Sequence, residues 1–457
     1  MRTLIIDTVS KIGEKITIEG WVHSRRDHGK IMFLDLRDRT GLIQVVSVKS
    51  LCDVHPEDCV AVTGTVKARP ATMVNPKLAT GTIEMDVEEI NVYSKAAELP
   101  FPLDSDGREI SEEVRLKYRY LDLRRERLQH NIRQRSTMVD SMRQYLFRNG
   151  FTEIETPMLT KSTPEGSRDF LVPSRLQPGK FYALPQSPQQ YKQLLMVAGF
   201  ERYFQIARCM RDEDLRADRG FEHTQLDIEM SFVKREDVMA MIEGLTIEVI
   251  EKLGGTILKK PFPVITYKEA MEKYGADKFD MRTPEEKAAG VHAFAWVVDF
   301  PFFEKDKNGN WTYTHNPFSD IREDQKKAFM DGQVEGIMTS QYDLVWNGFE
   351  AGGGSIRNSD PTILEKVFEV LGHGKEKIEG QFGHMLKAFS FGAPPHGGIA
   401  LGIDRFMMCI NGETSIKEVQ AFPQTSSGTT SVMEAPASLE PEQLAELGIS
   451  VLPPKKK

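Results

Sequence analysis

The sequence has little cysteine: four residues in a chain of 457, and no two of them form a C-x-x-C pair. Structural zinc sites usually need that spacing, so we expect no zinc finger or zinc ribbon. The chain also lacks an apolar run of transmembrane length, and its first residues, MRTLIIDTVSKIGEK, lack the apolar core of a signal peptide. We therefore expect a reduced, cytoplasmic protein with no membrane partner.

A G-x-x-x-x-G-K-[ST] phosphate loop is also missing, which excludes the P-loop nucleotide-binding proteins. Positive charge is not in excess, since the net charge is −8. That value counts against nucleic-acid binding over the whole surface but leaves room for a local basic face. The remaining composition, 40% hydrophobic and 28% charged, is ordinary for a globular protein of two or more domains.

The first hundred residues have the pattern of short strands separated by turns. The segments KITIEGWV, KIMFLDLRD, GLIQVVSV, CVAVTGTV and GTIEMDVEEINV each alternate between apolar and polar residues, with Gly, Pro, Asp or Asn between them. Five short strands in so few residues predict a small β-barrel, most simply an OB-fold, over residues 1–100.

One strand of this barrel carries an aromatic residue on its polar face. In IMFLDLR the apolar residues at 32, 34 and 36 share one face, so Phe33 falls on the charged face. Arg25 and Arg26 lie just upstream. Stacking on an aromatic ring beside positive charge is how single-stranded RNA is bound, and the alternative is that another element covers Phe33.

A proline-containing linker, 101–113, separates this barrel from the rest of the chain. The stretch from Val114 to Arg135 is strongly basic, which indicates either a solvated helix or a surface that faces RNA. From Gly150 onward, strands and helices mix without a regular βαβ repeat. We therefore expect an α+β domain over 114–457, built on an antiparallel sheet with flanking helices.

The stretch RCMRDEDLRADRGFEHTQLDIEMSF concentrates charge beside a strand with alternating polarity. Arg211 and Glu213 lie two residues apart, as on one face of a strand, and Gln225, Asp227 and Glu229 share the polar face of the next strand. Buried polar groups in such a row need partners. Two alternatives stay open, a bound charged substrate and an internal network of salt bridges.

Three further segments carry candidate binding residues. In PQSPQQYKQLL, Ser187, Gln189 and Lys192 lie where a strand leads into a helix, an arrangement that suits either a zwitterion or an ordinary helix cap. In YDLVWNGFEAGGGSIR, Asp343 and Glu350 have the oxygen ligands that Mg²⁺ prefers, although the glycines also suit a plain hairpin.

The same YDLVWNGFEAGGGSIR segment ends on Arg357, which is left to pair with an anion. In PPHGGIALGIDRF, an apolar strand meets Gly402, and Asp404 and Arg405 follow at the start of a helix. An arginine at that junction would meet an anion arriving over the end of the strand.

Taken together these segments resemble the three signature motifs of class II aminoacyl-tRNA synthetases. GFTEIETPML resembles motif 1, the segment 201–229 motif 2, and GGIALGIDRF motif 3. Within the class, KYRYLDLRR, ALPQSPQQYKQLL, RDEDLRADR, NGFEAGGGSIR and GIDRF resemble a bacterial-type aspartyl-tRNA synthetase, over nearly the whole chain. The resemblance implies activation of L-aspartate by ATP with Mg²⁺, transfer to tRNA(Asp), and a homodimer with Pro157 at its interface.

The resemblance also implies individual roles, with Arg211, Arg405 and Glu350 central to catalysis. For ATP it implies Arg211, Asp212, Glu213, His223, Glu350, Gly402, Ile403, Asp404 and Arg405. For the amino acid it implies Glu165, Ser187, Gln189, Lys192, Arg211, Asp227, His315 and Arg357. For the metal it implies Asp343 and Glu350, and for the anticodon Arg26, His28, Phe33 and Gln44.

Several positions depart from the family pattern. His223 stands where an adenine-stacking phenylalanine is usual, Gly220 replaces a glutamine, and Asn316 replaces the second histidine of a pair. A short connection near 275–295 stands in place of the large inserted domain of bacterial relatives.

His28 bears on which tRNA is charged. In the family, a histidine at that position accompanies enzymes that also charge tRNA(Asn), with an amidotransferase converting the product. A strictly tRNA(Asp)-specific enzyme and a non-catalytic tRNA-binding paralogue are the alternatives. Arg357 and Lys192 weigh against the lysyl and asparaginyl enzymes, because both side chains favour an acidic substrate.

Overall fold

The computed structural model describes residues 2–48, 53–162 and 166–453. The chain divides into two compact units, residues 1–102 and 103–457. Each unit has its own hydrophobic core.

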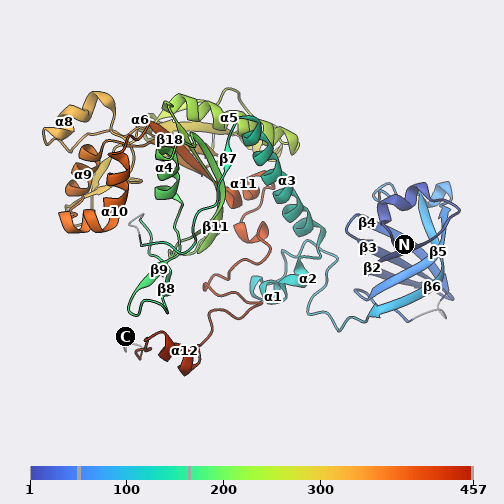
Figure 1. Cartoon of the computed structure of the whole chain (residues 1–457). Coiled ribbons are helices and arrows are strands. Elements are labelled where there is room, and N and C mark those ends of the chain that lie inside the picture. The colour runs from blue at the N-terminus through green and yellow to red at the C-terminus, as the bar shows by residue number, and fades with distance from the viewer. Residues whose placement is uncertain (1, 49–52, 163–165, 454–457) are drawn as a thin grey trace. The chain divides into compact units, whose positions relative to one another are not determined.

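The first unit is a closed β-barrel (Figure 1). Its strands are β1 (Arg2–Thr3), β2 (Lys15–His28), β3 (Ile31–Asp38), β4 (Gly41–Val48), β5 (Cys59–Ala68) and β6 (Ile83–Ser94), with short 3-10 turns at Ile5–Ser10 and Ala71–Met73. They follow the order β1-β2-β3-β4-β6-β5, and β2 also pairs with β5, which closes a ring of five strands. The short β1 joins β2 in parallel outside that ring. The predicted five-stranded OB-fold is therefore confirmed.

The second unit is built on one eight-stranded sheet, in the order β12-β13-β16-β17-β18-β11-β10-β7. Its strands are β7 (Thr152–Glu153), β10 (Arg202–Met210), β11 (Glu222–Ser231), β12 (Val264–Thr266), β13 (Phe294–Val298), β16 (Gln341–Trp346), β17 (Phe349–Ile356) and β18 (His396–Gly402). The six central strands pair antiparallel, and the two short edge strands pair in parallel. The α+β prediction is confirmed, with a mixed rather than purely antiparallel sheet.

Helices and two small hairpins complete this unit. The hairpins are β8 (Leu171–Pro173) with β9 (Phe181–Ala183) and β14 (Phe303–Lys305) with β15 (Trp311–Tyr313). The helices are α1 (Glu112–Lys117), α2 (Arg119–Asp122), α3 (Glu126–Arg148), α4 (Gln189–Val197), α5 (Arg235–Lys252), α6 (Tyr267–Tyr274), α7 (Pro284–Ala288), α8 (Lys326–Met330), α9 (Pro361–Val370), α10 (Lys375–Phe389), α11 (Ile403–Ile410) and α12 (Pro441–Glu446). Among the described residues, no helix is long and apolar enough to cross a membrane.

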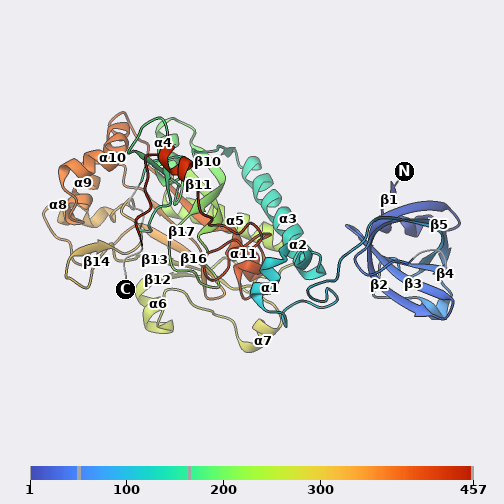
Figure 2. The same ribbon diagram turned by 90° about the horizontal axis from the view of Figure 1, so that it is seen from below.

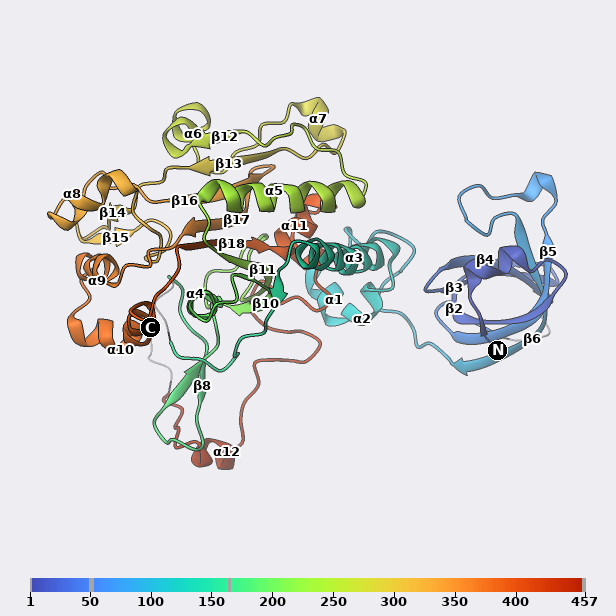
Figure 3. The same cartoon turned by 45° about the horizontal axis from the view of Figure 1, so that its top comes forward.

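Helices α3 and α5 cover one face of the sheet (Figure 3). Apolar side chains of both helices pack against the apolar face of the central strands, where Leu226, Ile228, Ile399 and Leu401 are fully buried. Because side chains alternate along a strand, the residues between these four face the other side of the sheet. That opposite face holds the candidate site.

Three arginines of the basic stretch from Val114 to Arg135 are buried rather than solvated: Arg115, Arg119 and Arg125. Asp122 is fully buried and accepts hydrogen bonds from Arg115, Arg119 and Arg125. Arg115 also forms a bidentate pair with Glu418, at 3.1 and 2.8 Å. These arginines fasten α1 and α2 to the segment that follows α11.

The connection between β12 and β13 is short, and every residue of it is described. Helix α6 begins with a capping box between Thr266 and Glu269 and ends at Gly275, whose φ of 71° suits glycine. Helix α7 begins with a second capping box at Thr283. Figure 2 shows α6 and α7 at the edge of this unit, with no further domain between them.

Candidate active site

A cavity of about 290 Å³ opens on the face of the sheet opposite α3 and α5. Of the residues predicted from the sequence, it is lined by Ser187, Gln189, Lys192, Arg211, His223, Asp227, His315, Asp343, Glu350, Arg357, Gly402, Asp404 and Arg405. They come from α4 and its approach, from β10 to β11, from the segment after β15, from β16 to β18, and from the start of α11. The departures Gly220 and Asn316 line it too. Segments far apart in the chain therefore meet in one cavity.

Three predicted residues have other surroundings. Asp212 pairs with Arg168 at 3.1 Å, and Glu213 pairs with Arg219. Ile403 is fully buried in the core beneath the cavity. Glu165 lies outside the described residues, so its role stays a prediction.

Two arginines from distant parts of the chain line the cavity, Arg211 and Arg405. Arg211 follows β10, and its Nε donates to the backbone carbonyl of Gln186 at 3.3 Å. Arg405 lies in the first turn of α11 and donates to the backbone carbonyl of Glu350 at 3.0 Å. Its other nitrogen lies 3.2 Å from the Asp218 carboxylate. Two guanidinium groups in one cavity suit a ligand with several anionic groups.

His223 contributes an uncharged ring to the same wall. Burial, together with the positive charge of Arg211, lowers its pKa from 6.5 to about 4. The imidazole is therefore neutral at physiological pH. A neutral planar ring beside two arginines suits a ligand that joins an aromatic base to phosphates.

The other part of the cavity contains a buried network of four charges. The Lys192 Nζ lies 2.8 Å from an Asp227 oxygen and 3.4 Å from a Glu229 oxygen. Arg357 holds Glu229 with two bonds, at 2.9 and 3.1 Å, and donates to Ser355 at 2.8 Å. The internal network, one of the two alternatives drawn from the sequence, is therefore present. Lys192, Asp227 and Arg357 still line the cavity, so the network also presents both signs of charge to a ligand.

Glu229 is the member of this network that sequence reasoning left without a role. Its side chain is fully buried, and although burial works to raise its pKa, Arg357 and Lys192 hold that pKa below the usual value. A Cβ at Gly398 would overlap the backbone carbonyl of Ile228 and the Glu229 carboxylate, which explains the glycine there. The alternation Gln225, Asp227, Glu229 was the signal that could have placed it in the site.

A second acidic group lies where β16 and β17 run side by side. Asp343 is 2% exposed, and burial together with Glu350 raises the pKa of its carboxyl group well above the usual value. A Cβ at Gly353 would stand 3.0 Å from Asp343 and 3.5 Å from Glu350, so the glycine leaves the space between the two carboxylates open. The raised pKa means that the ionised form of Asp343 is unfavourable without a nearby positive charge. A bound hard cation such as Mg²⁺ would supply that charge.

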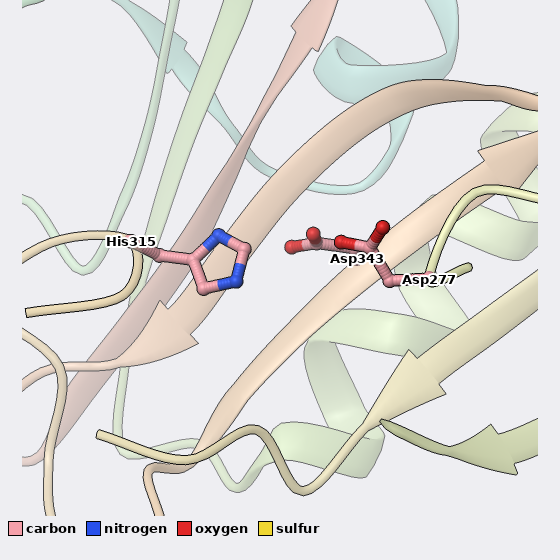
Figure 4. A group of neighbouring side chains, drawn as sticks. All are labelled: Asp277, His315 and Asp343. Atoms are coloured by element: carbon pink, nitrogen blue, oxygen red, sulfur yellow. The ribbon is translucent and has the colours of Figure 1, made fainter. Parts of the chain in front are cut away.

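Sequence reasoning missed one neighbour of this pair. Ligand atoms of Asp277, His315 and Asp343 lie within 4.8 Å of one another. Figure 4 shows the three side chains reaching toward a common space from different segments. Asp277 belongs to the short connection after α6. In the sequence this segment was notable only because it stands in place of an inserted domain.

The barrel presents its own candidate face for RNA. Its predicted residues lie together: Arg26 is the cross-strand partner of Phe33 and reaches Gln44 at 3.4 Å, and the His28 ring lies 5.6 Å from the Phe33 ring, edge to face. Phe33 is half-buried, so part of its side chain meets solvent. Asp35, on the same charged face of β3 as Phe33, pairs with Arg26 at 3.1 Å.

Comparison with known proteins places this architecture. The family model for tRNA synthetases class II (D, K and N) matches residues 111–426, and the model for an OB-fold nucleic acid binding domain matches residues 16–93. The chain therefore belongs to the class II tRNA synthetases, a class of ligases that use ATP.

Relatives define the branch of that class. The chain is 40% identical to the aspartate–tRNA(Asp/Asn) ligase of Phenylobacterium zucineum, over 98% of each chain. It is 37% identical to the aspartate–tRNA ligase of Staphylococcus saprophyticus, over 97% of this chain and 98% of that protein. Within the class, this chain is a member of the aspartate–tRNA ligase family.

Solved structures agree on the fold. The aspartyl-tRNA synthetase of Entamoeba histolytica superposes with a TM-score of 0.74 at 22% identity, over 93% of this chain and 91% of the other. The asparaginyl-tRNA synthetase of Pyrococcus horikoshii, in complex with asparaginyl-adenylate, has a TM-score of 0.73 at 22% identity, over 94% of this chain and 97% of the other.

This chain is shorter than its sequence relatives. The alignment with the Phenylobacterium protein spans 579 positions, whereas this chain has 457 residues. More than a hundred residues of that relative therefore have no counterpart here, which agrees with the short connection between β12 and β13.

Proposed function

We propose that this chain activates L-aspartate with ATP and transfers it to the 3′ end of tRNA(Asp). One observation carries the proposal: Arg211 and Arg405 line the same cavity as the carboxylates of Asp343 and Glu350. Together they offer phosphate contacts and metal ligands around one space. The family membership supports the same reaction.

Arg211 and Arg405 would bind the phosphates of ATP. In the first step an oxygen of the aspartate α-carboxylate attacks the α-phosphorus, and the bond to pyrophosphate breaks. Negative charge spreads over the phosphate oxygens during this displacement, so guanidinium groups fixed around them lower the barrier. The site needs no protein nucleophile, since its part is to position two substrates and neutralise charge.

The neutral ring of His223 would stack on adenine. Its lowered pKa leaves the ring uncharged beside the two arginines. Gly402 and Asp404 line the same side of the cavity. Asp404 accepts a hydrogen bond from Arg135 at 2.6 Å and another from the Thr224 amide. Its carboxylate therefore helps to hold α11 and β11 in position around the cavity.

Lys192 and Arg357 would select an acidic amino acid. Both cations line the cavity and are held by buried partners, so they are fixed before a ligand arrives. The side-chain carboxylate of aspartate can take charge-assisted bonds from them, whereas the amide of asparagine presents a donor to the same cations. Asp227, with Ser187 and Gln189 nearby, would receive the ammonium group.

Asp343 and Glu350 would hold Mg²⁺. The fit lies in two carboxylates that share an open space over Gly353, one of them with a raised pKa. When bound, this cation would supply positive charge that neutralises part of the negative charge on the phosphates.

The barrel would read the anticodon. Arg26, Phe33 and Gln44 form one face on which a base can stack while polar groups contact its edge. The division of labour follows the two units: residues 1–100 for the anticodon, 101–113 as the linker, and 114–457 for catalysis. In the second step a ribose hydroxyl of the terminal adenosine attacks the aspartyl-adenylate, and AMP leaves.

The same face bears on whether tRNA(Asn) is charged too. Relatives named aspartate–tRNA(Asp/Asn) ligase and relatives named aspartate–tRNA ligase are similar to this chain to nearly the same degree, 40% and 37% identity. The choice therefore rests on His28, whose ring packs against Phe33. We favour charging of both tRNAs, with an amidotransferase converting the Asp-tRNA(Asn).

A homodimer formed through β7 completes the proposal, in the cytoplasm where tRNA and ATP are found. Strand β7 is an edge strand, and Pro157 follows it. Phe147 and Leu159, on either side of it in the chain, are 48% and 52% exposed. An edge strand flanked by exposed apolar side chains suits a second copy of the same surface.

The test is aspartate-dependent exchange of pyrophosphate into ATP, followed by charging of purified tRNA(Asp) and tRNA(Asn). We expect exchange with aspartate and none with asparagine or lysine. A non-catalytic tRNA-binding paralogue would bind tRNA without any exchange, and that result would overturn the proposal. Charging of tRNA(Asp) alone would leave the activity standing and remove the role of His28.

A further inference from the structure

The connection that stands in place of an inserted domain reaches the proposed metal pair. Between α6 and α7 the chain passes close to β17, and the Nζ of Lys278 lies 2.7 Å from a carboxylate oxygen of Glu350. The preceding residue, Asp277, lies within 4.8 Å of the ligand atoms of Asp343 and His315. Two consecutive residues of one short segment therefore place opposite charges at the same acidic group.

The two oxygens of Glu350 face different neighbours. Oε1 is the oxygen near Gly353, on the side of Asp343, whereas Oε2 is the oxygen that meets Lys278. The Lys278 ammonium group thus neutralises the carboxylate through Oε2 and leaves Oε1, on the side of Asp343, open. It also places a positive charge within a few ångströms of the space that a cation would enter, where like charges repel.

Lys278 is not part of the hydrophobic core. Its side chain is 43% exposed and that of Glu350 is 29% exposed. A lysine so exposed contributes little packing, and a substitution there is expected to leave the fold intact. Its one ionic partner among the described residues is Glu350, so its charge acts on the metal carboxylates.

We propose that the ammonium group of Lys278 neutralises and positions Glu350 while no metal is bound. Its positive charge weakens cation binding until ATP supplies phosphate oxygens as further ligands. This inference rests on the proposed Asp343–Glu350 metal pair. Its consequence is that the free enzyme binds a divalent cation poorly, and that the cation and the nucleotide bind together.

The test measures Mn²⁺ binding to the whole chain without nucleotide, from the loss of the free Mn²⁺ signal in electron paramagnetic resonance. Mn²⁺ is the probe because it takes the same oxygen ligands as Mg²⁺. In Lys278→Met we expect the Mn²⁺ dissociation constant to fall by about two- to fivefold, the range of a partly exposed ion pair. In Lys278→Arg, which keeps the charge, we expect the value of the unmodified chain. Asp277→Asn should weaken binding, since it removes a neighbouring carboxylate.

A matched control exists in the same connection. Lys287 pairs with Asp280 at 3.2 Å and its side chain is 49% exposed, so Lys287→Met removes an equivalent charge away from the metal pair. This control should bind Mn²⁺ as the unmodified chain does. Unchanged or weaker binding in Lys278→Met would overturn the inference about Lys278.

A double variant separates this inference from the metal proposal itself. In Lys278→Met combined with Asp343→Asn, the gain in Mn²⁺ affinity should disappear. If the gain persisted there, the proposed Asp343–Glu350 pair would be wrong. A second readout is the Mg²⁺ concentration for half-maximal exchange, which should fall in Lys278→Met and stay constant in Lys287→Met.

Discussion

Arg405 donates a hydrogen bond to the backbone carbonyl of Glu350, at 3.0 Å. Arg405 lies in the first turn of α11 and Glu350 lies on β17, so this bond joins the guanidinium proposed for a phosphate to the strand that carries a proposed metal ligand. Strand β17 pairs with β18, and α11 follows β18 directly, so these three elements fix the positions of both residues. A change in that frame should therefore act on nucleotide and metal together.

Gly353→Ala tests the open space between the carboxylates. The added Cβ would stand 3.0 Å from the Asp343 oxygen, so the carboxylate pair must shift. We expect the Mg²⁺ concentration for half-maximal exchange to rise by about tenfold, the effect of about 1.4 kcal/mol on cation binding. Gly380→Ala on α10 is the control, because an added Cβ there would meet nothing within 4 Å and the residue does not line the cavity. Equal Mg²⁺ dependence in the two variants would contradict the assignment.

Glu229→Gln tests the buried network. The change leaves Arg357 and Lys192 with one carboxylate fewer in a fully buried position, and losing one partner of a buried pair costs about 3–5 kcal/mol of unfolding free energy. We also expect a higher KM for aspartate, because both cations lose their support. Glu222→Gln on the same strand is the control: Glu222 pairs with an exposed Arg208, and the cost should stay below about 1 kcal/mol. Denaturant unfolding measures the loss of unfolding free energy in each of the two variants.

His223 should make folding stability depend on pH. Its folded pKa of about 4 is below the ordinary 6.5, so as the pH falls through that window the unfolded chain takes up a proton that the folded chain refuses. Stability is therefore lost below pH 6.5, by up to about 2 kcal/mol at pH 5 from this group. His223→Phe should remove that part of the dependence. Unfolding curves at pH 5 and pH 7 that shift equally in both proteins would contradict the assignment.

Glu418 should also make the fold lose stability as the pH falls, but over a lower pH range than His223. Although burial works to raise it, bonds from Arg115 and Arg127 hold the pKa of Glu418 at about 2, below the ordinary 4.5. Its contribution is present above pH 4.5 and is lost as the pH falls toward 2. Glu418→Gln should lower the unfolding free energy at pH 7 by about 3 kcal/mol. Near pH 2, where Glu418 no longer contributes, the variant and the unmodified chain should have similar unfolding free energies. An unchanged midpoint at pH 7 would show that the arginine cluster does not hold α1 in place.

Much of the site could be predicted because strands alternate. The polar row Gln225, Asp227 and Glu229 pointed to one face, and the structure places that face toward the cavity while Leu226 and Ile228 meet α3 and α5. The motif residues Arg211 and Arg405 followed from family resemblance, since nothing local in the sequence shows that residues so far apart meet.

Other parts depended on tertiary contacts. The basic stretch after Val114 was ambiguous because charge alone does not reveal a buried Asp122 or a distant Glu418 as partners. Asp277 and Lys278 were invisible for a similar reason: they lie on an irregular connection with no periodicity, and only the fold brings them to Glu350 and Asp343.

The measurement that tests the central claim most directly is aspartate-dependent pyrophosphate exchange in Arg211→Ala and in Arg405→Ala. If both guanidinium groups bind the phosphates of one ATP, each variant should lose activity by about 10²- to 10³-fold, as when a fixed donor to a developing negative charge is removed. Thermal unfolding near that of the unmodified chain would show that the fold is kept. Full exchange activity in either variant would contradict the account.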